Sequence, residues 1–140
     1  MIWVVDASVA VRWFLADEFH PNAEAVMQQM IFDPESFAVP ELFGFEVYAV
    51  LERLHPAGSQ AFREGVLPIL EGGVFRQPIS EDLILRANRF VRMGLTGYDA
   101  CYAALAEDLG GGWLTFDQKT HRIIEQECLS VFLADELPWG

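Results

Sequence analysis

Cysteine and histidine, the residues that mark disulfide-rich and zinc-binding proteins, are scarce in this chain of 140 residues. Only two cysteines are present, Cys101 and Cys128, and they form neither a Cys-x-x-Cys pair nor a Cys/His zinc spacing. The three histidines show no His-x-His or His-Glu-x-x-His spacing. The sequence therefore excludes a disulfide-stapled domain and a conventional zinc site. We expect both cysteines to be reduced, buried thiols of a cytoplasmic protein.

Positive charge is also in short supply. Nine Lys and Arg residues stand against 21 Asp and Glu residues, which gives a formal net charge of −12 at pH 7. A surface this acidic repels polyanions in general. The composition therefore counts against a protein that binds nucleic acid by simple electrostatic attraction.

Long apolar runs are missing as well, because charged residues interrupt every apolar window well short of a membrane span. No basic segment precedes an apolar stretch at the N-terminus, so we expect neither export nor membrane insertion. What the chain does have is 52% hydrophobic residues, without an internal repeat or a low-complexity linker. This content is enough to fill one core, and we predict a single domain over residues 1–140.

The most informative stretch is the apolar run Ile2–Val5, which leads directly into Asp6. A run of this kind is typical of a strand buried on both faces, and the apolar spacing that follows is typical of a helix. Asp6 therefore lies at the carboxyl end of a strand, where open α/β sheets place their ligands. The alternative is that Asp6 or Ser8 only caps the first helix, and the residues alone leave both interpretations open.

The rest of the chain alternates between helical patterns and short apolar strands. Strands separated by helices pair in parallel through right-handed crossovers, so the predicted fold class is α/β. The expected helices cover residues 8–15, 21–31, 41–54, 59–70, 80–93, 96–109 and 117–126, and the expected further strands cover 37–39, 74–76, 113–115 and 129–133.

Glu46 is an acid in an unexpected position. On a helical wheel it falls between Leu42 and Val50, on the apolar side of the helix predicted over residues 41–54. A carboxylate that faces inward needs a partner, a metal ion or a raised pKa. The alternative to a functional role is an ion pair with an arginine such as Arg53.

Asp99 and Asp117 each lie at a predicted helix start. Asp99 follows Thr96 at the spacing of a capping box, and Asp117 follows the strand 113–115, so both can be plain capping residues. However, the alanines that follow Asp99 have small side chains. They allow the N-terminus of this helix to pack closely against the edge of the sheet. Asp117 would point into the same crevice as Asp6 if their two strands are neighbours.

The basic residues give weaker signals. Arg86, Arg89 and Arg92 recur at every third position of one predicted helix and can contact phosphate, although a solvated helix face is the favoured interpretation. Arg12, half a helix away from Asp6, is the better-placed candidate for contact with a substrate or a partner.

Five segments of the chain form a recognisable series. They are Val4-Val5-Asp6-Ala7-Ser8, Val39-Pro40-Glu41-Leu42 with Glu46, Thr96-Gly97-Tyr98-Asp99-Ala100, Tyr102-Ala103-Ala104-Leu105-Ala106 and Leu114-Thr115-Phe116-Asp117. In their order and spacing these segments resemble the PIN-domain proteins, and most of all the ribonuclease toxins of the VapC family. The resemblance implies a three-layer α/β/α fold with a central parallel sheet. It also implies a metal site made by Asp6, Glu46, Asp99 and Asp117, with Ser8 and Thr115 as polar support.

The implied chemistry suits these residue types. Crowded carboxylates repel one another unless divalent cations neutralise them, and Mg²⁺ or Mn²⁺ prefers oxygen ligands with retained water. Such ions activate water for attack on a phosphodiester, so the resemblance implies an endoribonuclease that leaves a 5′ phosphate. In this interpretation Asp6, Asp99 and Asp117 bind metal directly or through water, whereas Glu46 either binds metal or orients the attacking water.

The resemblance further implies the toxin of a toxin–antitoxin pair. We expect a small antitoxin that binds the active-site groove, where an arginine of the antitoxin can be held by one of the carboxylates and displace the metal. The apolar helices after Pro21 and Pro40 and the hairpin through Leu70 would bind the rest of the antitoxin, and they are also the expected face of a homodimer. Core packing is the competing use of these apolar residues. The alternatives are a noncatalytic binding module of the same fold and a receiver-like regulatory domain. A receiver would have paired acids after its first strand and a Lys after a late strand, whereas this chain has one acid, Asp6, and Lys119 lies within a helix.

Overall fold

The computed structural model describes residues 1–139, and its centre is a five-stranded sheet in which all strands are parallel. The strand order is β3-β2-β1-β4-β5. β1 lies between β2 and β4, so both of its edges are paired. Its side chains are all apolar and both of its faces are covered, as its sequence predicts. The strands are β1 (Trp3–Val5), β2 (Phe37–Pro40), β3 (Phe75–Gln77), β4 (Gly112–Thr115) and β5 (Ser130–Phe132).

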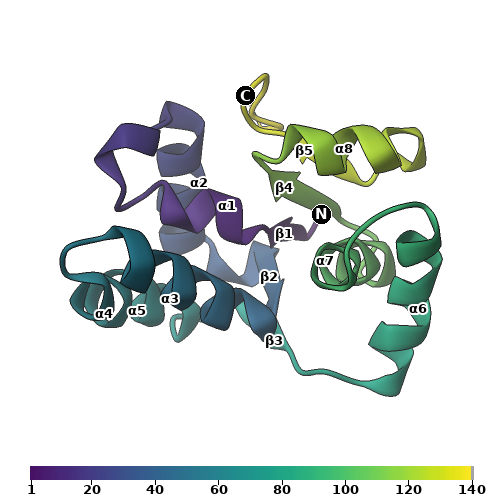
Figure 1. Cartoon of the computed structure of the whole chain (residues 1–140), viewed down its shortest axis with the longest axis horizontal. Helices are drawn as coiled ribbons and strands as arrows, with labels where there is room; N and C mark the ends of the chain where they lie inside the picture. The colour runs from purple at the N-terminus through teal and green to yellow at the C-terminus, as the bar shows by residue number, and fades with distance from the viewer. Residues whose placement is uncertain (140) are drawn as a thin grey trace.

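Helices cover both faces of this sheet (Figure 1). Helices α1 to α5 lie on one side and α6 and α7 on the other, while α8 packs beside β5. The predicted three-layer α/β/α architecture is therefore confirmed. The helices are α1 (Ala7–Val11), α2 (Pro21–Phe32), α3 (Leu42–Leu54), α4 (Gly58–Ala61), α5 (Leu67–Leu70), α6 (Glu81–Arg92), α7 (Gly97–Asp108) and α8 (Gln118–Ile124).

Two of the predicted helices differ from the observed ones. The first ends at Val11 instead of residue 15, and a turn and the 3₁₀ helix Ala16–Glu18 follow. The predicted helix over 59–70 is divided into α4, the π-helical turn Phe62–Val66 and α5. Pro68 explains the division, because it has no N–H to donate and its ring displaces the carbonyl one turn earlier.

The core lies on both sides of the sheet and determines how closely α7 approaches it. Ala100, Ala103, Ala104 and Ala106 are all fully buried, and α7 packs against β1, β2 and β4. Small side chains permit this close packing. The N-terminus of α7, which carries Asp99, is consequently held at the edge of the sheet, as the alanine-rich sequence predicts.

The two cysteines are free thiols in different environments. Cys101 is buried, as predicted, but Cys128 is exposed, so the prediction of a second buried thiol is wrong. Cys128 ends the 3₁₀ helix Glu125–Glu127 with a left-handed φ of 56°, a conformation typical of surface turns. Within residues 1–139, the helices are too short or too polar to span a membrane.

Candidate active site

The carboxyl ends of β1 and β4 meet where the order of the strands reverses. From β1 the sheet continues through β2 to β3 in one direction, whereas β4 and β5 lie in the other. Open α/β sheets bind their ligands at this topological switch point. Asp6 follows β1 directly and Asp117 lies just beyond β4. The expectation that their two strands are neighbours is confirmed.

Asp6 is a buried carboxylate, with only 7% of its surface exposed. It caps α1 by accepting a hydrogen bond from the Ser8 N–H (3.1 Å), and it accepts two longer ones, from Trp113 Nε1 and Thr115 Oγ1 (3.3 Å each). Burial raises its pKa from 3.8 to about 6, with a smaller contribution from the negative charge of Asp99. Asp6 is therefore a helix cap, as one of the two interpretations predicts, and also a buried acid within electrostatic range of Asp99.

Glu46 extends from α3 toward the same region and is half-buried. Its Oε1 atom accepts a hydrogen bond of 2.7 Å from the Tyr102 hydroxyl. No ion pair between Glu46 and an arginine occurs in residues 1–139, so the predicted alternative of an Arg53 partner is wrong. Burial raises the pKa of Glu46 from 4.5 to about 7, and the charges of Asp6 and Asp99 add to the increase.

Asp99 and Asp117 are joined by the side chain and backbone of Thr120. Thr120 Oγ1 donates to Asp99 Oδ2 (3.3 Å), and the Thr120 N–H donates to Asp117 Oδ1 (3.0 Å), which makes Asp117 the cap of α8. Thr96, and not Asp99, caps α7, because Thr96 Oγ1 accepts the Asp99 N–H (3.1 Å). The Asp99 carboxylate is therefore turned toward Asp117. Burial raises the pKa of Asp99, and the charge of Asp117 adds to this.

Ser8 and Thr115 connect the acids to the backbone of the strand ends. Ser8 Oγ accepts the Phe116 N–H (3.0 Å). Thr115 Oγ1 donates to Asp6 and accepts the Asp117 N–H (3.0 Å), so that a single hydroxyl bridges two of the four acids. Thr115 is fully buried, and this burial restricts the movement of the hydroxyl that forms the bridge.

Electrostatic interactions connect the four acids in series, with Asp117 at one end beside Asp99. The charges of Asp6 and Asp99 raise the pKa of Glu46, and the charge of Asp117 raises that of Asp99. The carboxylates line one edge and do not converge on a point. In residues 1–139, no three Asp, Glu, His or Cys side chains are close enough to form a preassembled metal site.

Three residues of this region were not identified from the sequence: Tyr102, Trp113 and Thr120. Tyr102 lies one helical turn after Asp99, and Thr120 lies at the third position of the helix that Asp117 caps. These spacings place side chains next to the acids and are the signals that could have found them. Trp113 has no such local signal, because its contact with Asp6 depends on the pairing of β1 with β4.

The arginines are largely occupied by other residues of the protein. The Arg12 guanidinium lies 4.3 Å from the centre of the Phe116 ring and 4.0 Å from Glu18. Arg86 and Arg89 form ion pairs with the acids of α6, of α7 and of the segment after α8, namely Asp82, Glu107, Asp108 and Glu127. The solvated-face interpretation of Arg86 and Arg89 is thus favoured over phosphate binding.

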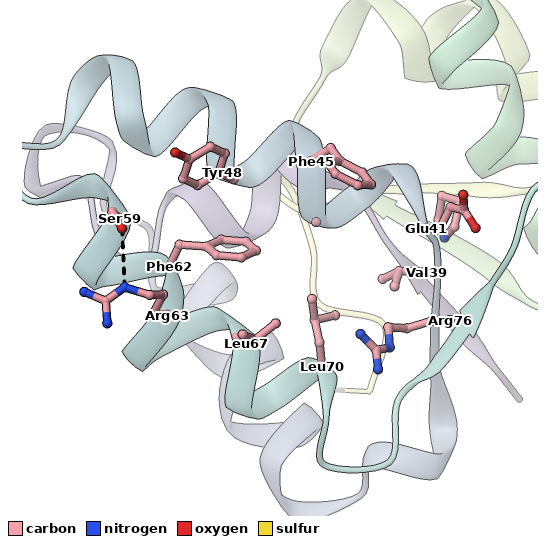
Figure 2. Close-up of a pocket in the computed structure, with 12 residues that line it drawn as sticks. Val39, Glu41, Phe45, Tyr48, Ser59, Phe62, Arg63, Leu67, Leu70 and Arg76 are labelled. Carbon is pink, nitrogen blue, oxygen red and sulfur yellow. Dashed lines mark hydrogen bonds between the residues drawn. The ribbon is translucent and has the colours of Figure 1, made fainter.

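An apolar groove of about 650 Å³ lies between α3 and the hairpin α4–α5. Figure 2 shows Phe45 and Tyr48 of α3 on one side and Phe62, Leu67 and Leu70 on the other. Phe45 is 74% exposed, an unusual state for a large apolar side chain on a rigid helix. Two arginines, Arg63 and Arg76, lie at the rim of the groove. The helix after Pro21 lines a separate depression with α5.

Comparisons with known proteins agree with this fold. The PIN domain family model matches residues 3–125 of the chain. FitAcB from Neisseria gonorrhoeae is 12% identical with a TM-score of 0.67, covering 89% of this chain and 94% of its own. A second solved structure, of FitAB bound to an IR36 DNA fragment, is 13% identical with a TM-score of 0.67, covering 89% of this chain and 91% of its own.

Two further solved structures are similar over most of both chains. VapC20 from Mycobacterium tuberculosis, a toxin that cleaves the sarcin-ricin loop, is 17% identical with a TM-score of 0.65, covering 86% of this chain and 93% of its own. PAE2754 from Pyrobaculum aerophilum is 25% identical with a TM-score of 0.61 and coverage of 97% and 98%. Among curated protein sequences, none matches the chain.

Proposed function

Because the chain belongs to the PIN-domain family, we propose that it is a metal-dependent endoribonuclease that hydrolyses RNA phosphodiester bonds in the cytoplasm. The observation that supports this proposal most strongly is a series of neighbouring acids near the switch point of the sheet, in which the charges of Asp6 and Asp99 act on Glu46 and the charge of Asp117 acts on Asp99. Burial raises the pKa of three of these carboxyls, and the negative charge of a neighbouring acid adds to each increase.

The donor set fits Mg²⁺ or Mn²⁺. All four candidate ligands are carboxylates, and the buried Asp6 has no ion-pair partner in residues 1–139. Mg²⁺ commonly binds one or two carboxylates and keeps several waters, so acids that line an edge without converging are suitable ligands. We assign Asp6, Asp99 and Asp117 as direct or water-mediated ligands. Glu46 either joins them or orients the attacking water.

When bound, the metal supplies a Lewis acid that activates water and stabilises charge on the phosphodiester. The protein's own contribution is to fix the carboxylates. Ser8 and Thr115 hold Asp6 at the end of β1, and Thr120 holds Asp99 beside Asp117. Hydrolysis adds OH to phosphorus and a proton to the departing 3′ oxygen, which leaves a 5′ phosphate.

The decisive experiment compares cleavage of RNA by protein stripped with chelator and by the same protein supplied with Mn²⁺ or Mg²⁺. Cleavage should require the metal and be abolished by Asp6→Asn. Asp17→Asn is the matched control, because Asp17 is an exposed acid in the 3₁₀ helix Ala16–Glu18 and is not one of the four candidate ligands. If metal binds but no RNA is cut under any condition, the chain is a noncatalytic binding module of the PIN fold.

The substrate is proposed to be a narrow set of structured or single-stranded RNAs. The net charge of −12 works against attraction of RNA in general. Arg12 is the cation we assign to substrate contact near the site. Its guanidinium lies over Phe116, which adjoins Asp117 in the chain, and its ion pair with Glu18 is long at 4.0 Å. Sequencing of 5′-phosphate ends after induced expression identifies the cut sites. Indiscriminate digestion of total RNA at physiological salt contradicts this proposal.

We further propose that the protein is the toxin of a toxin–antitoxin pair and that the antitoxin occupies the groove of Figure 2. An apolar segment of the partner would bury Phe45, Tyr48 and Phe62, while acidic residues beside it would meet Arg63 and Arg76. The partner to test is the product of a small reading frame adjacent to the gene of this chain. It should copurify and suppress cleavage, and Phe45→Asp should weaken the complex without affecting cleavage by the free protein.

A homodimer is proposed on a second apolar patch, which adjoins the groove of Figure 2 near Phe45. The patch combines Ile79, Ile84 and Leu85, which are 69%, 46% and 67% exposed. A second copy can cover a patch of this kind with its own equivalent face. Sedimentation velocity should give a dimer for the protein and a monomer for Leu85→Glu. A monomeric parent protein contradicts the proposal.

A further inference from the structure

Tyr102 is a polar side chain placed entirely inside the protein. It lies on α7, one turn after Asp99, and none of its surface is exposed. Its hydroxyl donates the 2.7 Å hydrogen bond to Glu46 Oε1. A buried hydroxyl without a partner is costly, so the phenol is committed to this acceptor. The bond joins α3 to α7 across 56 positions of sequence.

The ring of Tyr102 is itself held in place. It stacks on Trp113 of β4 with the ring planes 8° apart and the centroids separated by 5.8 Å. Trp113 is also fully buried and donates its Nε1–H to Asp6 Oδ1. The stacked pair therefore provides two donors, one directed at Glu46 and one at Asp6. Neither ring can turn without disturbing the core.

From this geometry we propose that Tyr102 is a positioning residue, which holds Glu46 in the orientation that the metal site requires. The inference rests on the proposed function. Glu46 has three rotatable side-chain bonds and is only half-buried, so packing alone leaves its carboxylate free to point into solvent. A single donor on a rigid ring removes that freedom. Hydrogen-bond partners outside the ligand sphere orient metal ligands in this way.

The test is the affinity for Mn²⁺, measured by calorimetry on protein stripped with chelator. Tyr102→Phe removes only the hydroxyl and keeps the stacked ring. We expect binding to weaken by about 10-fold or more, the usual cost of losing a partner of a metal ligand. The matched control is Tyr98→Phe on the same helix, because Tyr98 is 67% exposed and should bind Mn²⁺ as the parent does.

A double-mutant cycle separates positioning from general damage. In protein that already carries Glu46→Gln, adding Tyr102→Phe should change Mn²⁺ affinity by less than about 2-fold, because the hydroxyl acts through Glu46. An equal loss in both backgrounds, or an unchanged affinity in Tyr102→Phe alone, overturns the inference while the metal site stands. If the parent protein binds no Mn²⁺ at all, the proposed function fails and this inference fails with it.

A measurement on the parent protein does not depend on how Tyr102→Phe folds. The chain has three tyrosines, which ring-labelled NMR resolves, and Tyr48→Phe and Tyr98→Phe assign the other two. Adding Mg²⁺ should shift the ring resonance of Tyr102, because the bound cation changes the electric field at Glu46, which accepts the hydrogen bond of Tyr102. A resonance that does not move on saturation with Mg²⁺ overturns the inference.

Discussion

Replacement of Asp6 by Asn should stabilise the metal-free protein at neutral and alkaline pH, although it abolishes cleavage. Asp6 is buried with a pKa raised from 3.8 to about 6. Two pKa units correspond to about 3 kcal/mol of unfavourable free energy when the carboxylate is charged. Asn is neutral and is as good a helix cap as Asp, so it removes this cost and keeps the hydrogen bond from Ser8.

The gain is partly offset at Trp113. The Trp113 Nε1–H donates to Asp6 Oδ1, whereas Ser8 and Thr115 donate to Asp6 Oδ2. If the oxygen of the substituted asparagine takes the place of Oδ2, its NH₂ group takes the place of Oδ1 and cannot accept the hydrogen bond from Trp113. Loss of this hydrogen bond costs about 1 kcal/mol. The net expectation at pH 8 is an increase of about 1 to 2 kcal/mol in the free energy of unfolding.

The sign of the pH dependence follows from the direction of the shift. The folded pKa of Asp6 lies above the unfolded value, so the folded state favours the protonated acid. Below about pH 4 the carboxyl is protonated in both states and imposes no charge cost. As the pH rises from there through about 6, the parent protein loses stability relative to Asp6→Asn, and above that range the difference is constant.

The assay is urea unfolding of chelator-stripped protein at pH 5 and pH 8. The parent should lose more stability between these values than Asp6→Asn does, whereas the control Asp17→Asn should follow the parent. Excess Mg²⁺ should reverse the order, because a ligand at 100 times its dissociation constant stabilises by about 2.7 kcal/mol and only the parent has the complete site. Equal stability of parent and Asp6→Asn at pH 8, or a lower stability of Asp6→Asn, refutes the reasoning.

Two other predictions follow from packing and from the contacts of Thr120. Gly65→Ala should destabilise the protein by about 1 to 3 kcal/mol, because the new methyl carbon would lie 2.4 Å from the Phe14 ring. Gly97→Ala, which meets no atom within 4 Å, is the control in the same thermal unfolding assay, and equal melting temperatures would contradict the packing argument. Thr120→Val should keep the backbone cap of α8 but release Asp99, so cleavage should fall by about 10-fold with a loss of stability near 1 kcal/mol. Unchanged cleavage by this variant would show that Asp99 needs no support from Thr120.

Much of the fold was predictable because its signals are local. The run from Ile2 to Val5 indicated a buried strand, Pro21 and Thr96 marked helix starts, and each is observed. The first helix was predicted to be too long because the contact that decides its end is not local. The helix after Asp6 ends at Val11 although apolar spacing continues, and beyond it Trp13 donates its Nε1–H to the carbonyl of Ala23.

The candidate acids were predictable in position but not in surroundings. Asp6 and Asp117 could be placed at strand ends from the pattern of apolar runs, and Glu46 stood out on an apolar helix face. The residue that partners Glu46 could not be identified in the same way. An arginine was the natural expectation for a half-buried acid, yet the observed partner is Tyr102, because α7 packs close enough to bring that phenol to α3.

The sequence by itself therefore determined the elements, the α/β class and the strand ends at which acids lie, since each depends on residues close together in the chain. Only the tertiary structure decided that β4 lies beside β1 and that Trp113 consequently meets Asp6, a pair 107 residues apart. The order of strands in a sheet depends on which apolar faces bury the most surface together. The strand order is thus a property of the whole core, and it cannot be predicted from a short stretch of sequence.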